Sequence, residues 1–209
     1  MKTEDLIAAL SQDTRPRARP LQVMALVILP ALLISFAFYG FILHPRVDLL
    51  HALQSPFVQG KFVLALAVVA SLFAALLRSA RPGARGIGIA GAVLPLVVVG
   101  LWVAGMITTP AGARMQGVLG YTILPCLVSI PAISVSILAA MLWALRAGAV
   151  TDPRKAGLLA GLVAGGLGTM IYATHCTEDN PMFYATWYTL GILIVGGAGA
   201  AIAPRVLRW

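Results

Sequence analysis

Six apolar runs dominate the sequence, and each is long enough to cross a lipid bilayer as a helix. They cover residues 21–43, 61–77, 87–107, 117–145, 156–174 and 187–203. The hydrocarbon core of a bilayer is about 30 Å thick and takes about 20 apolar residues per helical crossing. Only 11% of the 209 residues are charged and 60% are hydrophobic, which leaves short loops and no separate folded domain. The sequence therefore predicts an all-α, polytopic membrane protein, a bundle of six transmembrane helices.

The basic residues lie between these runs and predict the orientation, because cytoplasmic loops carry an excess of lysine and arginine. Three of the 15 basic residues fall on one side of the six runs, namely Arg46, Lys61 and Arg114. The other twelve fall on the side of the two chain ends: Lys2, Arg15, Arg17, Arg19, Arg78, Arg81, Arg85, Arg146, Arg154, Lys155, Arg205 and Arg208. We therefore expect a multi-pass protein of a bacterial inner membrane with both ends in the cytoplasm. Topology also explains the net charge of +8, so we expect no direct nucleic-acid binding.

The first 20 residues are polar and precede the bundle of residues 21–209, so we expect a cytoplasmic tail followed by one membrane domain. Within the tail, Leu6, Ile7 and Leu10 share one face of a predicted short helix. Such a helix is marginal alone in water. Its acidic neighbours Asp5 and Asp13 would be repelled by anionic lipid, so we expect a protein partner to cover the apolar face.

Both cysteines map to the outer half of the bundle. Cys126 lies in the fourth run, and Cys176 follows the fifth beside His175. Because consecutive spans run antiparallel, the two thiols could meet within disulfide reach, with Cα atoms about 4.4–6.8 Å apart. Thiolate and imidazole also bind zinc and similar soft ions, and Glu178 or Asp179 could complete such a shell. Redox sensing by Cys126 and Cys176, metal sensing by these two residues with His175, and a purely structural role all remain open. For a sensor, we expect Cys176 to be the exposed thiol that reacts first.

Internal glycines and prolines predict how the helices pack. Gly157, Gly161 and Gly165 recur at a spacing of four and give the fifth span a face that a neighbouring helix can approach closely. Pro125 and Pro131 lie in the fourth span, where proline removes a helical hydrogen bond. We expect this span to be irregular in its outer half, and it is our candidate for a moving part.

The sequence carries no phosphate-binding loop, no GxSxG and no HExxH motif, so we expect neither enzymatic activity nor a cofactor. A small-solute transporter or channel is the main alternative function, because prolines and glycines interrupt the spans. It is disfavoured because no ionisable residue lies in the middle of a predicted span. A membrane thiol oxidoreductase is a third alternative, which would need a CxxC motif or a bound quinone.

A wider set of residues, taken in order and spacing, is similar to one protein family. The set comprises Met1, Lys2, Thr3, Asp5, Leu6, Ile7, Leu10, Asp13, Pro56, Phe57, Lys61, Pro153, Ala156, Gly157, Gly161, Tyr172, Cys176, Thr177, Pro181, Phe183, Trp187, Tyr188, Arg205, Leu207, Arg208 and Trp209. With these residues the chain resembles the NrsF-type anti-sigma factors of proteobacteria over nearly its full length.

The resemblance implies a six-span anchor whose N-terminal segment sequesters an extracytoplasmic-function sigma factor. It also implies release under metal or oxidative stress, with two extracytoplasmic cysteines taking part in sensing. Matched position by position, the cysteines are Cys126 and Cys176, and the sigma-binding segment is roughly residues 3–13, with Asp5, Leu6, Ile7, Leu10 and Asp13.

Overall fold

The computed structural model describes Thr3, residues 20–81, Gly88 and residues 90–207, and this part of the chain is helical with short connections. The predicted sigma-binding residues lie outside the described residues: Asp5, Leu6, Ile7, Leu10 and Asp13. The predicted boundary at residue 20 coincides with the first residue of the first long helix.

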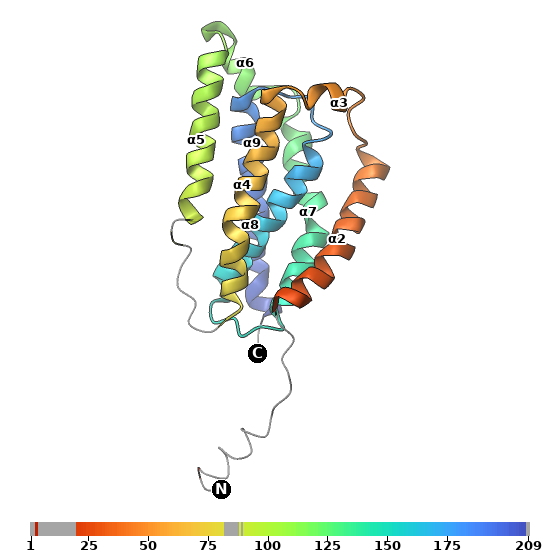
Figure 1. Cartoon of the computed structure of the whole chain (residues 1–209), viewed down its shortest axis with the longest axis vertical. Helices are drawn as coiled ribbons and strands as arrows, with labels where there is room; N and C mark the ends of the chain where they lie inside the picture. Colours follow the sequence, from red (N-terminus) through yellow and green to blue (C-terminus); the bar gives the residue numbers. More distant parts are fainter. Residues whose placement is uncertain (1–2, 4–19, 82–87, 89, 208–209) are drawn as a thin grey trace.

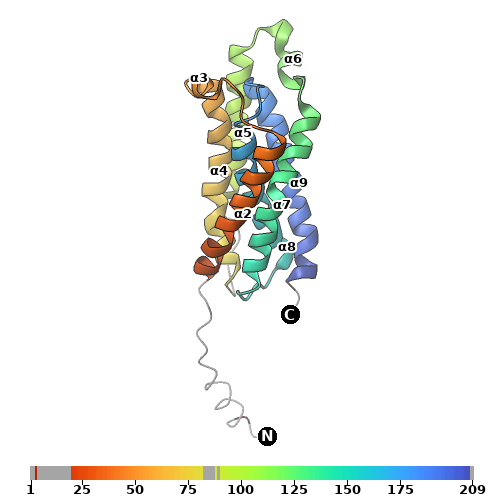
Figure 2. The same ribbon diagram turned by 90° about the vertical axis from the view of Figure 1, so that its right-hand side faces the viewer.

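Six of the helices are long and apolar enough to cross a membrane, which confirms the predicted fold class. The helices are α2 (Pro20–Ile42), α3 (Leu49–Ala52), α4 (Pro56–Ser79), α5 (Ala90–Thr108), α6 (Arg114–Leu119), α7 (Ile123–Leu145), α8 (Pro153–Tyr172) and α9 (Pro181–Val206), with a 3₁₀ turn at Ala111–Ala113. Helix α2 starts and helix α9 finishes at the same end of the bundle (Figure 1). The short helices α3 and α6 lie at the opposite end, here called the outer end (Figures 1 and 2).

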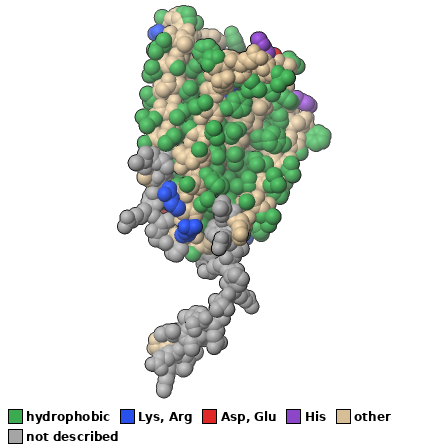
Figure 3. Space-filling view, in the orientation of Figure 1, with side chains coloured by type: hydrophobic (Ala, Val, Ile, Leu, Met, Phe, Trp, Pro, Cys, Tyr) green, Lys and Arg blue, Asp and Glu red, His purple; other side chains and the backbone are tan. Residues whose placement is uncertain are grey.

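Helix α8 lies at the centre of the bundle and packs most extensively on α9. The predicted close approach is confirmed, because Cβ atoms added at Gly157 and Gly161 would overlap backbone atoms of α9. Helices α4 and α7 cover other sides of α8, and α2 packs mainly on α7. On the face of the bundle seen in Figure 3, hydrophobic side chains cover most of the surface between the two ends. Leu26, Phe41 and Leu96 are among the exposed large hydrophobic residues of the long helices. This surface suits contact with lipid tails.

The predicted fourth span is broken, and the break differs from the one expected. It separates α6 from α7 at Gly120, whose φ of 53° lies in the left-handed region that favours glycine. A Cβ there would lie 2.6 Å from ring atoms of Phe183, so the tight turn also requires the small residue. Pro125 causes no break, because it lies in the first turn of α7, where backbone N–H groups have no helical partner. Pro131 is the proline inside α7.

The first outer connection is shorter than predicted, since α4 begins at Pro56 and so includes Lys61. Proline suits the first position of a helix because it lacks an N–H that would have no partner there. Lys61 is the sixth residue of α4 and is fully buried. The predicted start of the second span, at Lys61, is therefore too late, because α4 begins at Pro56.

Candidate thiol site at the outer end

The α8–α9 loop, residues 173–180, joins the two central helices and contains Cys176. Its last residue, Asn180, caps α9 by accepting a hydrogen bond from the Met182 N–H at 2.9 Å. The Asn180 amide also donates to the Thr109 hydroxyl beyond the end of α5, at 3.1 Å. Glu178 accepts a 2.7 Å hydrogen bond from the Tyr121 N–H in the turn before α7. The second half of the loop is thus tied to α5, the α6–α7 turn and α9.

The first half of the loop is bonded to the outer end of α2. The Tyr39 hydroxyl, near the end of α2, lies 2.6 Å from the Thr174 hydroxyl. The Nδ1–H of His175 donates to the His44 carbonyl at 2.7 Å, and the Arg46 N–H donates to the Thr174 carbonyl at 3.0 Å. These hydrogen bonds therefore couple the position of this half of the loop to the outer end of α2.

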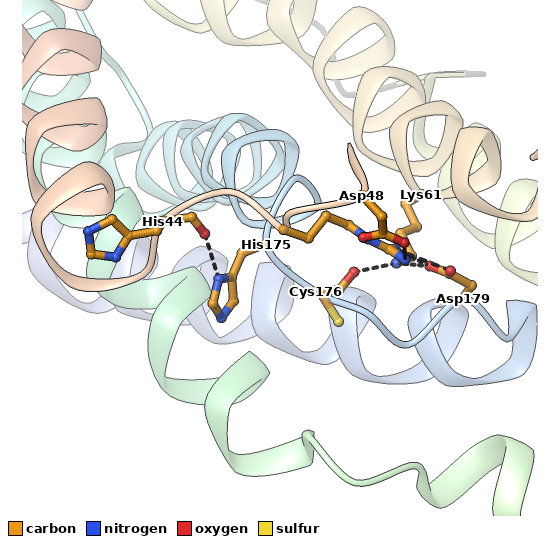
Figure 4. Close-up of polar contacts among 7 residues, drawn as sticks. His44, Asp48, Lys61, His175, Cys176 and Asp179 are labelled. Carbon is orange, nitrogen blue, oxygen red and sulfur yellow. Dashed lines mark hydrogen bonds and ion pairs between the residues drawn. The ribbon is translucent and has the colours of Figure 1, made fainter. Parts of the chain in front are cut away.

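A row of charged side chains holds the loop against α3 and α4 (Figure 4). The Lys61 ammonium lies 2.6 Å from an Asp179 oxygen and donates to the Cys176 carbonyl at 2.8 Å. One guanidinium nitrogen of Arg46 reaches both Asp179 oxygens, at 3.0 and 3.1 Å. Arg46 also makes two bonds to Asp48, at 2.7 and 2.8 Å. These hydrogen bonds raise the pKa of Arg46, chiefly through Asp48, and lower the pKa of Asp48.

The two cysteines come together at the inner side of this loop. Cys126 is the fourth residue of α7, is fully buried, and its sulfur lies 3.3 Å from the Tyr172 hydroxyl. The Cys126 thiol is also within hydrogen-bonding reach of the Cys176 sulfur, which is 3.9 Å from the Thr122 hydroxyl. Both cysteines are free thiols. The structure thus brings together the two residues that the sequence suggested could form a disulfide.

Cys176 is 2% exposed, which corrects the expectation of an exposed loop thiol. The loop folds inward because its polar groups are bonded to the surrounding helices, and this buries the sulfur against Tyr172 and Tyr188. The pKa of Cys176 is lowered, first by the hydrogen bond from Cys126 and then by the Lys61 charge, despite the opposing effect of burial. A buried thiol with a lowered pKa is poised to react as thiolate once a reagent reaches it.

A cavity of about 370 Å³ at the outer end provides a route toward this site. Its lining includes His44, Tyr172, His175 and Cys176, together with the charged side chains of Arg46 and Asp48. A small reagent entering from the outer end therefore meets Cys176 before it can meet Cys126.

The metal set of Cys126, Cys176 and His175 is not assembled. Within the described residues, no group of three His, Cys, Asp or Glu side chains is placed to hold a metal ion. The ring of His175 is turned toward the His44 carbonyl and lies apart from the Cys176 sulfur (Figure 4). Asp179 is engaged by two cations and Glu178 by a backbone N–H, so neither completes a shell. The geometry favours thiol chemistry over a metal centre.

The amino-acid sequence matches known proteins along its whole length. The family model described as "Negative regulator of sigma F", NrsF, matches residues 10–209. The chain belongs to the NrsF family. The probable anti-sigma-F factor NrsF of Azospira oryzae is 37% identical, and the anti-sigma-F factor NrsF of Caulobacter vibrioides is 34% identical. Both alignments span 100% of this chain and 100% of the relative. No solved structure matches the chain.

Membership of the NrsF family makes the chain an anti-sigma factor with a sigma factor as partner, a regulatory rather than a catalytic role. The alternatives of a transporter and of a thiol oxidoreductase gain no support from the family match. Among the residues of this NrsF-family site, sequence reasoning missed Lys61 and Arg46 as partners of the loop. One signal could have found Lys61, because an ionisable residue in an apolar span needs a partner and Asp179 lies at the same outer end. Arg46 lies in the connection between α2 and α3, so this signal does not apply to it.

Proposed function

We propose that this chain is a membrane-anchored anti-sigma factor that holds an extracytoplasmic-function sigma factor through residues 3–13. It releases the sigma factor when an oxidant, or a metal ion that binds thiolates, reacts at Cys126 and Cys176. The family match supports the anti-sigma role. The observation that carries the sensing role is the adjacency of the two free thiols, one of them with a lowered pKa, below a cavity at the outer end.

The proposed oxidation begins at Cys176. Its thiolate attacks one oxygen of hydrogen peroxide, the O–O bond breaks, and hydroxide leaves and takes up a proton to give water. The product at Cys176 is a sulfenic acid. The Cys126 sulfur then attacks the Cys176 sulfur, and the sulfenic oxygen departs as a second water with the Cys126 proton. The result is a disulfide that joins α7 to the α8–α9 loop.

Coupling to the tail follows the bonds of the loop. A disulfide needs its sulfur atoms about 2.05 Å apart, so the two residues must approach, and the Cys126–Tyr172 hydrogen bond is lost. The change alters the packing of α7 on α8 and pulls on Thr174 and His175, which are bonded to Tyr39 and His44. Helix α2 then carries the displacement to its other end, where it is joined to the N-terminal segment.

The orientation is part of the proposal, with the membrane being the bacterial inner membrane. At the end opposite the outer end, here called the inner end, Arg78 lies in the last turn of α4 and Arg81 follows it, and Arg146 and Arg154 flank the connection between α7 and α8. Cytoplasmic loops are enriched in such residues, which supports a cytoplasmic location for this end and for both chain ends. The thiol site would then face the periplasm.

A pull-down tests the sigma-binding role. The full chain and a variant without residues 1–20 are expressed at equal levels in membranes. We expect a sigma factor to co-purify with the full chain and to be absent from the deletion variant. Equal recovery of the sigma factor by both proteins would refute the assignment of the tail.

Replacement of Leu6, Ile7 and Leu10 by alanine tests the apolar face of the tail. Each side chain is worth about 1.5–3 kcal/mol if fully buried in the complex, so sigma-dependent transcription becomes constitutive. The variant Thr14→Ala, a polar position outside residues 3–13, is the control and should repress normally. Normal repression by the triple variant, present in the membrane at the normal level, would place the interface elsewhere.

Serine at each cysteine tests the sensor. Neither thiol is near the inner end, so Cys176→Ser and Cys126→Ser should keep basal repression. Both should lose release by hydrogen peroxide, because no disulfide can form. A normal response of Cys176→Ser to every oxidant and metal ion tried would exclude the two-thiol sensor and leave the anti-sigma role intact.

A further inference from the structure

Lys61 is a fully buried cation near the start of α4. Its side chain is 0% exposed, and its neighbours on α4 include the buried residues Leu64 and Ala65. Burial of an ammonium group is costly unless the charge is paired and its N–H groups are bonded. Lys61 meets this requirement through two acceptors, Asp179 and the carbonyl of Cys176. An apolar side chain would fill the same space without the free-energy cost of desolvating a charge. The presence of a charge at this position therefore indicates a role beyond packing.

Pairing with Asp179 does not supply that explanation. The Asp179 carboxylate already accepts hydrogen bonds from Arg46 at both of its oxygens. Asp179 is 34% exposed and also reaches water. It would therefore stay paired and solvated without Lys61. The second acceptor of Lys61 is the carbonyl of the one loop residue that carries a thiol.

The orientation of Cys176 follows from this bond. Figure 4 shows the Cys176 carbonyl directed toward Lys61 and the sulfur directed away from it. The sulfur faces the group formed by Cys126, Tyr172 and Tyr188. Fixing the peptide fixes the direction of the Cα–Cβ bond and hence the side of the loop on which the sulfur lies.

We propose that Lys61 is the positioning residue of the sensor thiol, which holds Cys176 by its peptide carbonyl and supplies the positive charge that stabilises its thiolate. The proposal rests on the proposed role of Cys126 and Cys176 as the sensor. It adds a residue of α4 to a site otherwise built from α7, α8 and their loops. Lys61 does not react; it acts through Cys176.

Other titratable and charged groups surround the sulfur. They are Cys126 from α7, Tyr172 from α8, Tyr188 from α9, His175 and Glu178 from the same loop, and His44, Arg46 and Asp48 across the cavity, with Asp179 beyond Lys61. The charges of Arg46 and Lys61 are balanced by Asp48 and Asp179. The hydrogen bond from Cys126 is the largest cause of the lowered pKa of Cys176, and Lys61 is the cation that lowers it further, against the opposing effect of burial. A nearby positive charge favours the thiolate, so loss of the Lys61 charge should raise the pKa of Cys176.

The test measures the pH dependence of Cys176 alkylation in the purified full-length protein in detergent micelles. Iodoacetamide is the probe: the thiolate displaces iodide and forms a carbon–sulfur bond, and mass spectrometry of the Cys176 peptide gives the rate. In Lys61→Met, which keeps the length and loses the charge, the midpoint of the rate profile should rise by at least about one unit. In Lys61→Arg, which keeps the charge, the midpoint should stay within about half a unit of the parent.

Asp179→Asn provides a second variant with an effect of opposite sign. It is isosteric and leaves the Lys61 charge less neutralised, so the midpoint should fall below that of the parent. If Lys61→Met does not fold, this variant still tests whether the Lys61 charge acts on the Cys176 thiol. An unchanged midpoint in Lys61→Met, or a rise in Asp179→Asn, would overturn the role of Lys61. The measurement does not involve a sigma factor, so its failure is distinct from a failure of the two-thiol sensor.

Discussion

Substitution of Gly161 by alanine tests whether backbone contact between α8 and α9 stabilises the bundle. A Cβ at this position would overlap the Val195 carbonyl and lie 2.7 Å from the Gly196 Cα. Backbone atoms cannot rotate away, so the two helices must separate along their most extensive interface. Overpacking of this kind costs about 1–3 kcal/mol.

Gly197→Ala is the matched control, since a Cβ at Gly197 meets nothing within 4 Å. Alanine favours a helix over glycine by about 1 kcal/mol at both positions, so this contribution cancels in the comparison. The free energy of unfolding should therefore be about 1–3 kcal/mol lower for Gly161→Ala than for Gly197→Ala. The assay is denaturation in mixed micelles followed by circular dichroism. Stabilities within about 0.5 kcal/mol of each other would refute the close packing as a source of stability.

Three further predictions concern the Lys61–Asp179 pair, the Asp152 cap of α8 and the membrane topology. Asp179→Asn removes the anion beside buried Lys61 and should lower the free energy of unfolding by about 2 kcal/mol. Loss of a fully buried pair would cost more, but Asp179 is one-third exposed. Asp48→Asn, at an exposed carboxylate, should have a smaller effect in the same denaturation assay. The pKa of Asp152 is lowered by hydrogen bonding from the Lys155 N–H, so its capping of α8 contributes stability above about pH 4 that is lost as the pH falls through the lowered value. Asp152→Asn should keep the cap and lose this pH dependence, and equal acid sensitivity of the two proteins would contradict the assignment. A reporter fused after Asp179 should report the periplasm, whereas activity of a cytoplasmic reporter at that position would overturn both the orientation and the sensor.

The six spans could be predicted from sequence because transfer of apolar helices into lipid depends on composition more than on partners. Their boundaries depend on local chemistry that hydropathy does not capture. Hydropathy places the start of the second span at Lys61, whereas proline at the first position starts helix α4 at Pro56. Gly120 interrupts the fourth span through its left-handed φ, and the apolar residues around it conceal that break.

The proximity of Cys126 and Cys176 could also be predicted, because antiparallel spans bring their outer ends together. The burial of Cys176 could not. It depends on bonds from Lys61 and Tyr121 that join residues far apart in the sequence. The lowered pKa of the thiol has the same origin, since its partners come from three other helices.

The central position of α8 has a consequence for biogenesis. Its mean hydropathy of 1.3 is the lowest of the six spans, and 78% of the residues in its most apolar stretch are buried in the bundle. A glycine-rich helix gains little by partitioning into lipid alone, so its insertion depends on neighbours already in the membrane. Helices α4 and α7 precede it during translation, and the short loop 173–180 brings α9 directly after it. We therefore expect α8 and α9 to leave the translocon together as a hairpin, and a nascent chain that terminates after α8 to be integrated poorly.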